Sequence, residues 1–387
     1  MSLIGQSVTV LGAGIAGLAV ARALALRGAG VVVLEQAAGF EDVGAGIQIS
    51  PNGAAVLRAL GLGPALEACS TRAEAVELRN GATGAVVTRL EVARLRPQHG
   101  YHFLHRADLV GLLAEGAREA GVEVRFGQRV DRVDLAGPWP ACDLGGIRHE
   151  AGLLIGADGL HSQVRDALNG ATAPFFTRQV AWRALIPGDG GPAVAEVHMG
   201  AGRHLVSYPL RGGALRNIVA VEERGDWAAE GWSHRDDPAA LRAAFAGFGP
   251  RVRGWLDAVQ QVHLWGLFRH PVAARWQAGA AAILGDAAHP MLPFLAQGAS
   301  MALEDAWVLA DCLAMADRPA AGLAAYQAAR APRCRRVVDA ASLNARLYHL
   351  SGLQRVVAHA GLKAVGRVAP SLPLRRFDWL YGLDVTR

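Results

Sequence analysis

The sequence predicts an α/β fold in which a Rossmann-like unit is interleaved with a sheet-rich domain and followed by C-terminal helices. Three observations predict this arrangement. The first 35 residues alternate strand, glycine-rich turn, helix and strand. Two later apolar strands end in the short sequences GADG and GD, as strands of one parallel sheet do at their carboxyl ends. Between them, residues 179–221 read as strands separated by turn residues.

The expected elements follow from local patterns. Strands are short apolar or β-branched runs, helices are Ala/Leu-rich or amphipathic stretches, and the helix at 51–61 is opened by proline. In order, we expect a strand at 7–11, a helix from about 15 to 27, a strand at 31–34, a helix at 51–61, antiparallel strands around 73–90, a helix at 106–120, a strand region at 122–134, a strand at 152–158, strands at 179–221, helical segments at 237–259, a strand at 280–284 and a long helical tract from about 297.

Composition excludes several classes of protein. The 387 residues are 52% hydrophobic, which excludes intrinsic disorder and allows more than one domain core. There are 39 basic and 34 acidic residues, and the arginines are scattered, so no nucleic-acid partner is predicted. The densest group is expected to be a solvated helix face; it comprises Arg330, Arg333, Arg335 and Arg336. The mild positive charge would attract small anionic substrates.

Cysteine usage and hydropathy predict the compartment. The four cysteines are far apart and form no CxxC pair, so we expect no metal centre, no dithiol centre and a reducing environment. The longest apolar stretch, about residues 8–21, is shorter than the roughly 18 residues that a membrane span needs. A cytoplasmic protein without a membrane span is therefore predicted.

The N-terminal glycines form a dinucleotide fingerprint. Gly12 permits a tight turn, Gly14 lets the backbone approach a pyrophosphate, and Gly17 allows close helix–strand packing. The helix that follows offers free N–H groups to the phosphates, and Glu35 can accept hydrogen bonds from ribose hydroxyls. The alternative is that the glycines only make a tight turn. The predicted contacts are Gly12, Gly14, Ile15, Ala16, Gly17 and Glu35.

Three further motifs follow in the chain: HRADL at 105–109, GADG at 156–159 with Ser162 and Arg165, and GDAAHP at 285–290 continuing through Pro293 and Gln297-Gly298. With the fingerprint, these motifs in this order resemble the single-component flavoprotein aromatic hydroxylases, the family of p-hydroxybenzoate hydroxylase. Within that family, the stretch from Gly285 is similar to the salicylate hydroxylase branch. The resemblance covers about residues 5–340.

The resemblance implies bound FAD and a role for each matching residue. Arg106 would contact FAD, Asp158 would serve FAD positioning and reduction by the nicotinamide, and Asp286 would bind the ribityl or pyrophosphate region. Each residue also has a purely structural alternative. Arg106 could be a surface arginine, Asp158 could belong to a strand-terminating turn, and Asp286 could cap the next helix. Independently, the helix beginning at Gly298 could direct its N-terminal amides to the flavin pyrimidine. The further predicted cofactor contacts are Pro293, Gly298, Ala299 and Ser300.

The resemblance also implies domains and activity. An FAD-binding domain is expected at 1–71, 100–178 and 272–340, a substrate domain at 72–99 and 179–271, and a C-terminal helical segment at 341–387. The expected enzyme uses NAD(P)H and O2 to hydroxylate a phenolic or aromatic-acid substrate through a flavin C4a-hydroperoxide. No second GxGxxG is found, so the nicotinamide would bind without a domain of its own. We expect a monomer or homodimer. Alternatives are a polycyclic or non-aromatic substrate, or a flavin-binding protein without turnover.

The segment Arg203–Pro209 supplies candidate substrate and catalytic residues. If it is a strand, His204 and Tyr208 point to one face, because side chains alternate with period two. His204 could take a phenolic proton; the alternative is a surface histidine beside a packed Tyr208. Pro293 offers no side-chain donor, so a substrate carboxylate would need Arg183 or Arg211.

Overall fold

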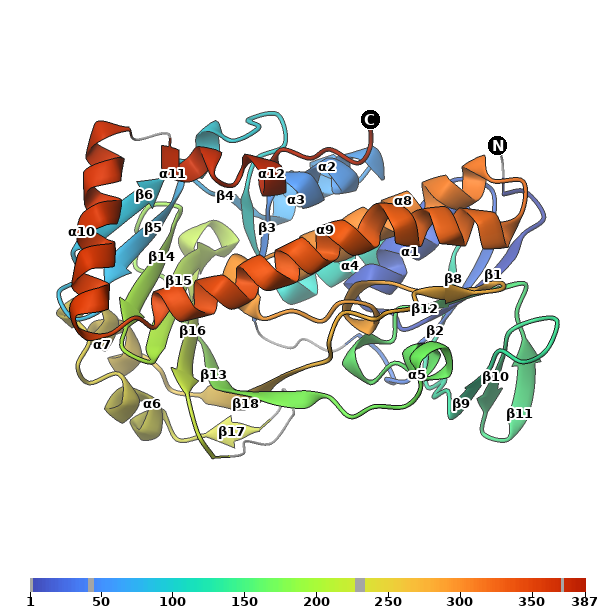
Figure 1. Ribbon diagram of the computed structural model, residues 1–387, viewed down its shortest axis with the longest axis horizontal. Helices are drawn as coiled ribbons and strands as arrows, with labels where there is room; N and C mark the ends of the chain where they lie inside the picture. Colours follow the sequence, from blue (N-terminus) through green and yellow to red (C-terminus); the bar gives the residue numbers. More distant parts are fainter. Residues whose placement is uncertain (1–2, 41–44, 227–233, 370–371) are drawn as a thin grey trace.

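A six-stranded sheet carries the N-terminal fingerprint (Figure 1). The computed structural model describes residues 3–40, 45–226, 234–369 and 372–387. All strand pairs of this sheet are parallel except the pair at the β19 edge. Its order is β19 (Gln277–Ala278), β20 (Ala281–Ile283), β12 (Leu153–Gly156), β1 (Ser7–Leu11), β2 (Gly30–Leu34) and β8 (Glu123–Arg125). The carboxyl ends of β1, β12 and β20 therefore meet at one edge, as the three motifs predicted.

Helices cover this sheet on both sides (Figure 1). On one side α1 packs against α4 and α8, and α8 packs against α9; on the other side α5 contacts β12 and β20. The bounds are α1 (Ile15–Ala25), α4 (Arg106–Glu119), α5 (Gln163–Asn169), α8 (Gly298–Met315) and α9 (Pro319–Tyr348). Beside α5 lies a three-stranded antiparallel sheet of β9 (Arg132–Asp134), β10 (Ala141–Leu144) and β11 (Ile147–Glu150), of which β10 and β11 were not predicted.

The second large sheet has eight strands. It is antiparallel except where β14 pairs in parallel with β5, a pairing that joins residues 75–80 to residues 194–199. Its order is β17 (Arg235–Asp236), β18 (Val262–Arg269), β13 (Phe175–Pro187), β16 (Leu215–Glu223), β15 (Arg203–Leu210), β14 (Val194–Gly200), β5 (Ala75–Asn80) and β6 (Val86–Leu90). One face packs against α6 (Pro238–Ala244) and α7 (Pro250–Asp257) around a core that includes Trp182 and Phe245.

Smaller elements join the two sheets. A three-stranded sheet orders β3 (Gly46–Ile49), β7 (His102–His105) and β4 (Thr71–Arg72), with α2 (Pro51–Ala59) and α3 (Gly63–Cys69) beside it. Short 3-10 turns are η1 (Val92–Arg94), η2 (Gly159–His161), η3 (Arg211–Gly213), η4 (Gly285–Ala287) and η5 (Pro293–Leu295). The chain closes with α10 (Gly352–Val368), α11 (Leu372–Arg375) and α12 (Asp378–Tyr381).

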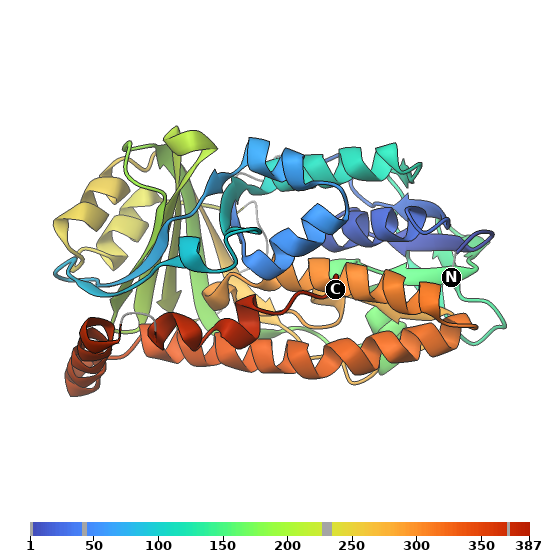
Figure 2. The same ribbon diagram turned by 90° about the horizontal axis from the view of Figure 1, so that it is seen from above.

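Helix α9 links the two halves of the molecule. Figure 2 shows it running along one side, from the six-stranded sheet to the eight-stranded sheet, where α10 turns away. The domain boundary predicted at 340/341 falls inside this helix. Among the described residues, no helix is both long and apolar enough to cross a membrane.

Candidate active site

The turn between β1 and α1 leaves no room for side chains at two of its glycines. Gly12 has a φ of +96°, and a Cβ there would lie 2.6 Å from the carbonyl oxygen of Ala157. A Cβ on Gly17 would lie 1.8 Å from the carbonyl oxygen of Gly12. At Gly14 the same construction meets nothing within 4 Å. Gly12 and Gly17 therefore serve packing, whereas Gly14 borders open space at the N-terminus of α1.

Glu35 closes the other side of this turn. One carboxylate oxygen accepts from the backbone N–H of Ala13 at 2.7 Å, and the other accepts from that of Ala37 at 2.8 Å. A carboxylate has about four acceptor positions, so two ribose hydroxyls can still donate to it. Together with the amides of Ile15 and Ala16 at the start of α1, Glu35 fits an adenosine pyrophosphate.

Arg106 and Asp286 approach one another at the carboxyl edge of the sheet. Arg106 opens α4 directly after β7, and Asp286 lies in η4 directly after β20. Loss of solvation by the surrounding protein raises the pKa of the Asp286 carboxyl, while His289 and Arg106 lower it. Burial lowers the pKa of Arg106, and Asp286 opposes that shift. Because Asp286 is nonetheless exposed to solvent, this charged pair borders an open site.

Asp158 holds a turn together. It follows β12, and its carboxylate accepts from the hydroxyl of Ser162 at 2.5 Å and from the backbone N–H of Gln163 at 2.8 Å. Ser162 in turn accepts from the backbone N–H of Arg165. Burial raises the pKa of Asp158, and these hydrogen bonds oppose the shift. The contacts match the turn-forming alternative, and a role in nicotinamide-dependent reduction stays a prediction.

The loop before α8 presents backbone rather than side chains. It runs from Pro293 through Ala296, whose φ of +51° is unusual for a residue with a Cβ. Helix α8 then starts at Gly298 without a side-chain cap, which leaves its first N–H groups available. Ser300 is buried and shares a 2.9 Å hydrogen bond with the hydroxyl of Ser50. The Ser50–Ser300 hydrogen bond thus fixes the start of α8, and a Cβ on Gly298 would meet no protein atom within 4 Å, which leaves room for a flavin beside these N–H groups.

A buried ionic network anchors α8 to α9. Arg330 is 1% exposed, and its Nε donates to Asp305 at 2.7 Å. Arg333 donates to both carboxylate oxygens of Glu304 at 2.8 Å. The prediction that the arginine cluster forms a solvated face was therefore wrong for these two arginines, because Glu304 and Asp305 of the preceding helix, α8, lie opposite them.

Atoms of His289, Asp305 and Cys334 lie within 4.8 Å of one another, in a geometry that could hold a metal ion. The guanidinium of Arg330 already lies against Asp305 and 3.8 Å from the sulfur of Cys334. Arg330 thus supplies positive charge in this cluster. Cys334 and Asp305 also raise the pKa of His289 against the effect of burial, and we assign no ion to the cluster.

A cavity of about 1040 Å³ lies between the eight-stranded sheet, η5 and the C-terminal helices. Most of its lining is apolar, and its polar positions include Gln48, Tyr101 and His204. His204 and Val206 line it while Leu205 packs into the opposite core, so the predicted alternation along β15 is observed. Pro293 also lines the cavity. The cavity thus brings together two of the predicted substrate residues.

Arg183 and Tyr208 do not line this cavity. The guanidinium of Arg183 lies 4.4 Å from the centre of the Trp265 ring, and burial lowers its pKa to about 10. Tyr208 raises that pKa, and Arg106 lowers it further. Tyr208 packs on Phe103 with ring centres 5.1 Å apart, and burial raises its pKa.

Arg211 lies at the surface and pairs with Asp108 at 3.0 Å. It is therefore no candidate for a substrate carboxylate. Three other arginines line the cavity, and no acidic residue of the described chain does; they are Arg336, Arg375 and Arg376. Sequence reasoning missed them because they come from α9 and the C-terminal segment after α10.

Gln48 and Tyr101 were missed as well, although they meet in the cavity wall through a 2.7 Å hydrogen bond. Alternation along residues 46–49 was the only local signal for Gln48.

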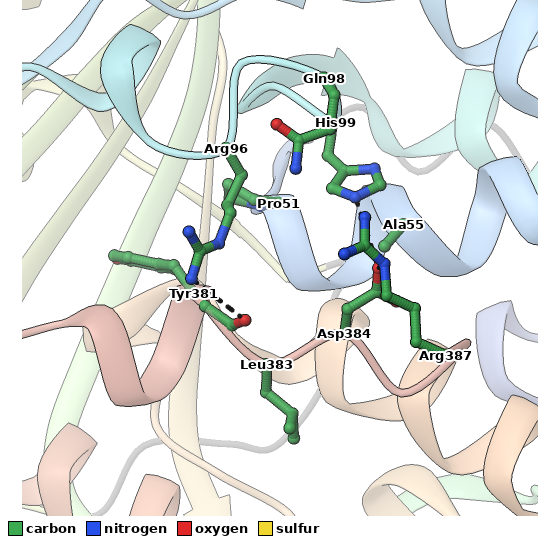
Figure 3. A pocket seen from close by; sticks show the side chains of 10 residues that line it. Pro51, Ala55, Arg96, Gln98, His99, Tyr381, Leu383, Asp384 and Arg387 are labelled. Atoms are coloured by element: carbon green, nitrogen blue, oxygen red, sulfur yellow. Dashed lines mark hydrogen bonds and ion pairs between the residues drawn. The ribbon is translucent and has the colours of Figure 1, made fainter.

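A separate polar pocket of about 220 Å³ lies between α2 and the C-terminal residues of the chain (Figure 3). His99 and Arg387 pair with Asp384 there, Arg96 donates to the carbonyl oxygen of Gly382, and none of the predicted site residues lines this pocket.

Comparisons with known proteins agree with this geometry. A family model described as "FAD binding domain" matches residues 6–341. A 3-amino-4-hydroxybenzoate 2-monooxygenase of Streptomyces platensis is 37% identical, covering 97% of this chain and 96% of that protein. A 3-hydroxybenzoate 6-hydroxylase of Polaromonas naphthalenivorans is 34% identical, with coverage of 98% and 96%. A salicylate hydroxylase structure in complex with substrate has the same fold, with a TM-score of 0.82 at 24% identity over 98% of this chain and 95% of that one.

The predicted fold, cofactor and enzyme class are confirmed by these matches. The turn at Gly14, the carboxylate of Glu35 and the Arg106–Asp286 pair provide a site that fits FAD. The chain belongs to the FAD-binding-domain family of flavoproteins, and it is an FAD-dependent aromatic monooxygenase.

Proposed function

We propose that this enzyme hydroxylates a small aromatic acid of the hydroxybenzoate class, with NAD(P)H as the electron donor. The observation that carries the proposal is the apolar cavity with a buried histidine in its wall and arginines around it. An apolar lining suits an aromatic ring. Arg336, Arg375 and Arg376, unopposed by any acid in the described lining, suit a carboxylate. The names of the two relatives above support the same substrate class.

His204 is the proposed base. It is 1% exposed, and both burial and the neighbouring His349 lower its pKa well below its usual range. The imidazole is therefore neutral at physiological pH and can accept a proton from a phenolic hydroxyl. Loss of that proton makes the ring richer in electrons and a better nucleophile. Phe294 and Tyr348 pack around His204, with ring centres 5.1 and 5.3 Å away, and they keep water from it.

The remaining residues position the cofactor. When bound, FAD supplies electron transfer from the nicotinamide and activation of dioxygen. Gly14, Ile15 and Ala16 would hold its pyrophosphate, Glu35 its ribose, and Arg106 with Asp286 the middle of the molecule. Gly298 and Ala299 would present N–H groups to the pyrimidine of the flavin, and Pro293 would separate it from the substrate.

The proposal extends to how the nicotinamide binds and to where the protein works. The nicotinamide would bind transiently, without a domain of its own, since one GxGxxG motif is found in the chain. A reducing, cytoplasmic location is supported by four cysteines that form no disulfide.

The test is a titration of the purified yellow protein with a panel of hydroxybenzoates, aminohydroxybenzoates and polycyclic phenols. We expect one benzoate to change the flavin absorbance, to accelerate NAD(P)H oxidation and to give one hydroxylated product per NAD(P)H. Acceleration by a polycyclic phenol and by no benzoate would contradict the substrate class. Flavin binding without NAD(P)H oxidation across the panel would contradict the enzymatic role.

A further inference from the structure

A chain of three titratable side chains leads from the cavity to the protein surface. His204 Nδ1 lies 2.7 Å from His349 Nε2, and His349 Nδ1 lies 2.7 Å from Glu223 Oε1. The side chain of His349 is 3% exposed, whereas that of Glu223 is 53% exposed. The chain therefore begins at a buried wall of the cavity and ends in solvent.

We infer that His349 and Glu223 form a proton exit route that removes the phenolic proton from His204. The inference rests on the proposed function, since it requires His204 to accept that proton. His349 follows the last residue of α9, and Glu223 is the last residue of β16. Neither residue lines the part of the wall that would touch the ring, so both act through His204 as positioning residues.

Glu223 determines the tautomer of both rings. As a carboxylate it only accepts, so His349 must donate from Nδ1 and carry the lone pair on Nε2. That lone pair accepts from Nδ1–H of His204, which leaves the lone pair of His204 on Nε2. Within the described chain no group hydrogen-bonds this Nε2 atom, and His204 lines the cavity. The base is thus oriented toward the substrate, by the logic of a catalytic triad.

In each proton transfer along this route, one bond to hydrogen breaks as another forms. The phenolic O–H bond breaks as an N–H bond forms at His204 Nε2, and the Nδ1 proton of His204 passes to His349 Nε2. The Nδ1 proton of His349 then passes to Glu223 and from there to water, while both rings exchange their tautomers. After hydroxylation a proton from solvent enters through Glu223, both rings return to their first tautomers, and His204 Nε2 gives its proton back to the product oxygen. No oxidant or co-reactant takes part.

Other charges around the route favour neutral rings. Burial lowers the pKa of His349; the carboxylate of Glu223 raises it, and Arg203 lowers it. Burial raises the pKa of Tyr348 in α9 to about 12, so this phenol stays protonated beside His204. Phe294 of η5 carries no charge, and His359 of α10 faces the same cavity. Arg203 is itself paired with Glu222.

The test measures proton release when a bound benzoate ionises. A pH-indicator dye in weakly buffered stopped-flow mixing follows the proton, and the phenolate absorbance of a bound nitrophenol analogue follows the ligand. The variants are His349→Gln and Glu223→Gln, with Glu222→Gln as the matched control on the same strand. We expect proton release about tenfold slower in His349→Gln, a smaller slowing in Glu223→Gln, and wild-type release in the control.

Two readouts separate proton transfer from mere packing. Because His349 lowers the pKa of His204, removing it makes His204 a stronger base, and the bound analogue should ionise at a lower pH in His349→Gln. Free imidazole should restore fast release in His349→Ala, where it can occupy the vacated space. If His349→Gln fails to fold, the surface variant Glu223→Gln still decides the question.

Wild-type release in both variants, or equal slowing in Glu222→Gln, would overturn the route. These results leave the proposed function standing as long as the wild-type enzyme hydroxylates the benzoate. Failure of the wild-type enzyme to bind or hydroxylate any benzoate would instead overturn the proposed function.

Discussion

The FAD turn takes its essential contacts from residues 12–35, whereas the cavity beside His204 takes its lining from residues spread between Gln48 and Tyr381. In the turn, backbone conformation and steric room at Gly12 and Gly17 decide the geometry. In the cavity, strands, two 3-10 turns and four helices each contribute a few side chains. The comparison teaches that cofactor binding here is a local property, while substrate choice depends on how distant segments pack.

Disrupting the buried ionic network between α8 and α9 should cause the largest loss of stability. Arg330→Leu leaves Glu304 and Asp305 buried without their main partner, and we expect a loss of about 3–5 kcal/mol in the free energy of unfolding. Denaturant unfolding measures it, with Arg335→Leu on the exposed face of α9 as the control. Equal effects of the two substitutions would show that the network does not hold α8 to α9.

The same network predicts a pH dependence. Asp305 has its pKa lowered to about 2 by His289 and Arg330, which outweigh the effect of burial. A depressed carboxyl pKa contributes stability above the unfolded value of about 3.9, and the contribution disappears as pH falls toward 2. We expect Asp305→Asn to lose stability relative to wild type at pH 6 and to approach wild type near pH 2, as measured by unfolding at both values.

His204→Ala tests the cavity side of the comparison. With saturating substrate we expect flavin reduction to survive while product per NAD(P)H falls and peroxide rises, because the phenol keeps its proton. The rate of hydroxylation should fall on the order of 10²-fold. Val206→Ala, on the same face of β15, is the control. Full coupling in His204→Ala would remove this histidine from the mechanism.

Gly14→Val tests the FAD side. The backbone at Gly14 is extended, with φ −78° and ψ −174°, and a Cβ there meets no protein atom within 4 Å. Valine therefore fits the fold but occupies the pyrophosphate position, and we expect FAD affinity to drop about 100-fold, or about 2.7 kcal/mol. Gly111→Ala, also with open space around its Cβ, is the control. A fully yellow Gly14→Val protein would contradict the assignment of this turn.

Substitution of Asp158 or Asp286, the two aspartates that follow β12 and β20, should have the smallest effects, and each should change a different step. Asp286→Ala removes the partner of Arg106 in the open site, so we expect FAD binding to weaken about tenfold, or about 1.4 kcal/mol. Asp158→Ala should keep FAD and slow reduction by NAD(P)H. Stopped-flow reduction and FAD titration separate the two; an unchanged reduction rate in Asp158→Ala would leave Asp158 only its role in the turn.

Sequence alone predicted the features whose physics is local. The order strand, GxGxxG, helix, strand and acid requires the turn that Gly12 and Gly17 form, because no other residue has the conformational freedom or the small size. The carboxyl ends of β12 and β20 followed from apolar runs ending in Asp-containing turns. Alternation along β15 likewise placed His204 and Tyr208 on one face.

Tertiary structure decided what depends on long-range packing. His349 lies 145 positions from His204, and no periodicity in either segment links them. The arginines around the cavity could not be told from surface arginines, since their charge acts only once α9 and the C-terminal segment cover the sheet. Arg330 is buried for the same reason: the fate of a charged side chain is set by the partner that the fold brings to it.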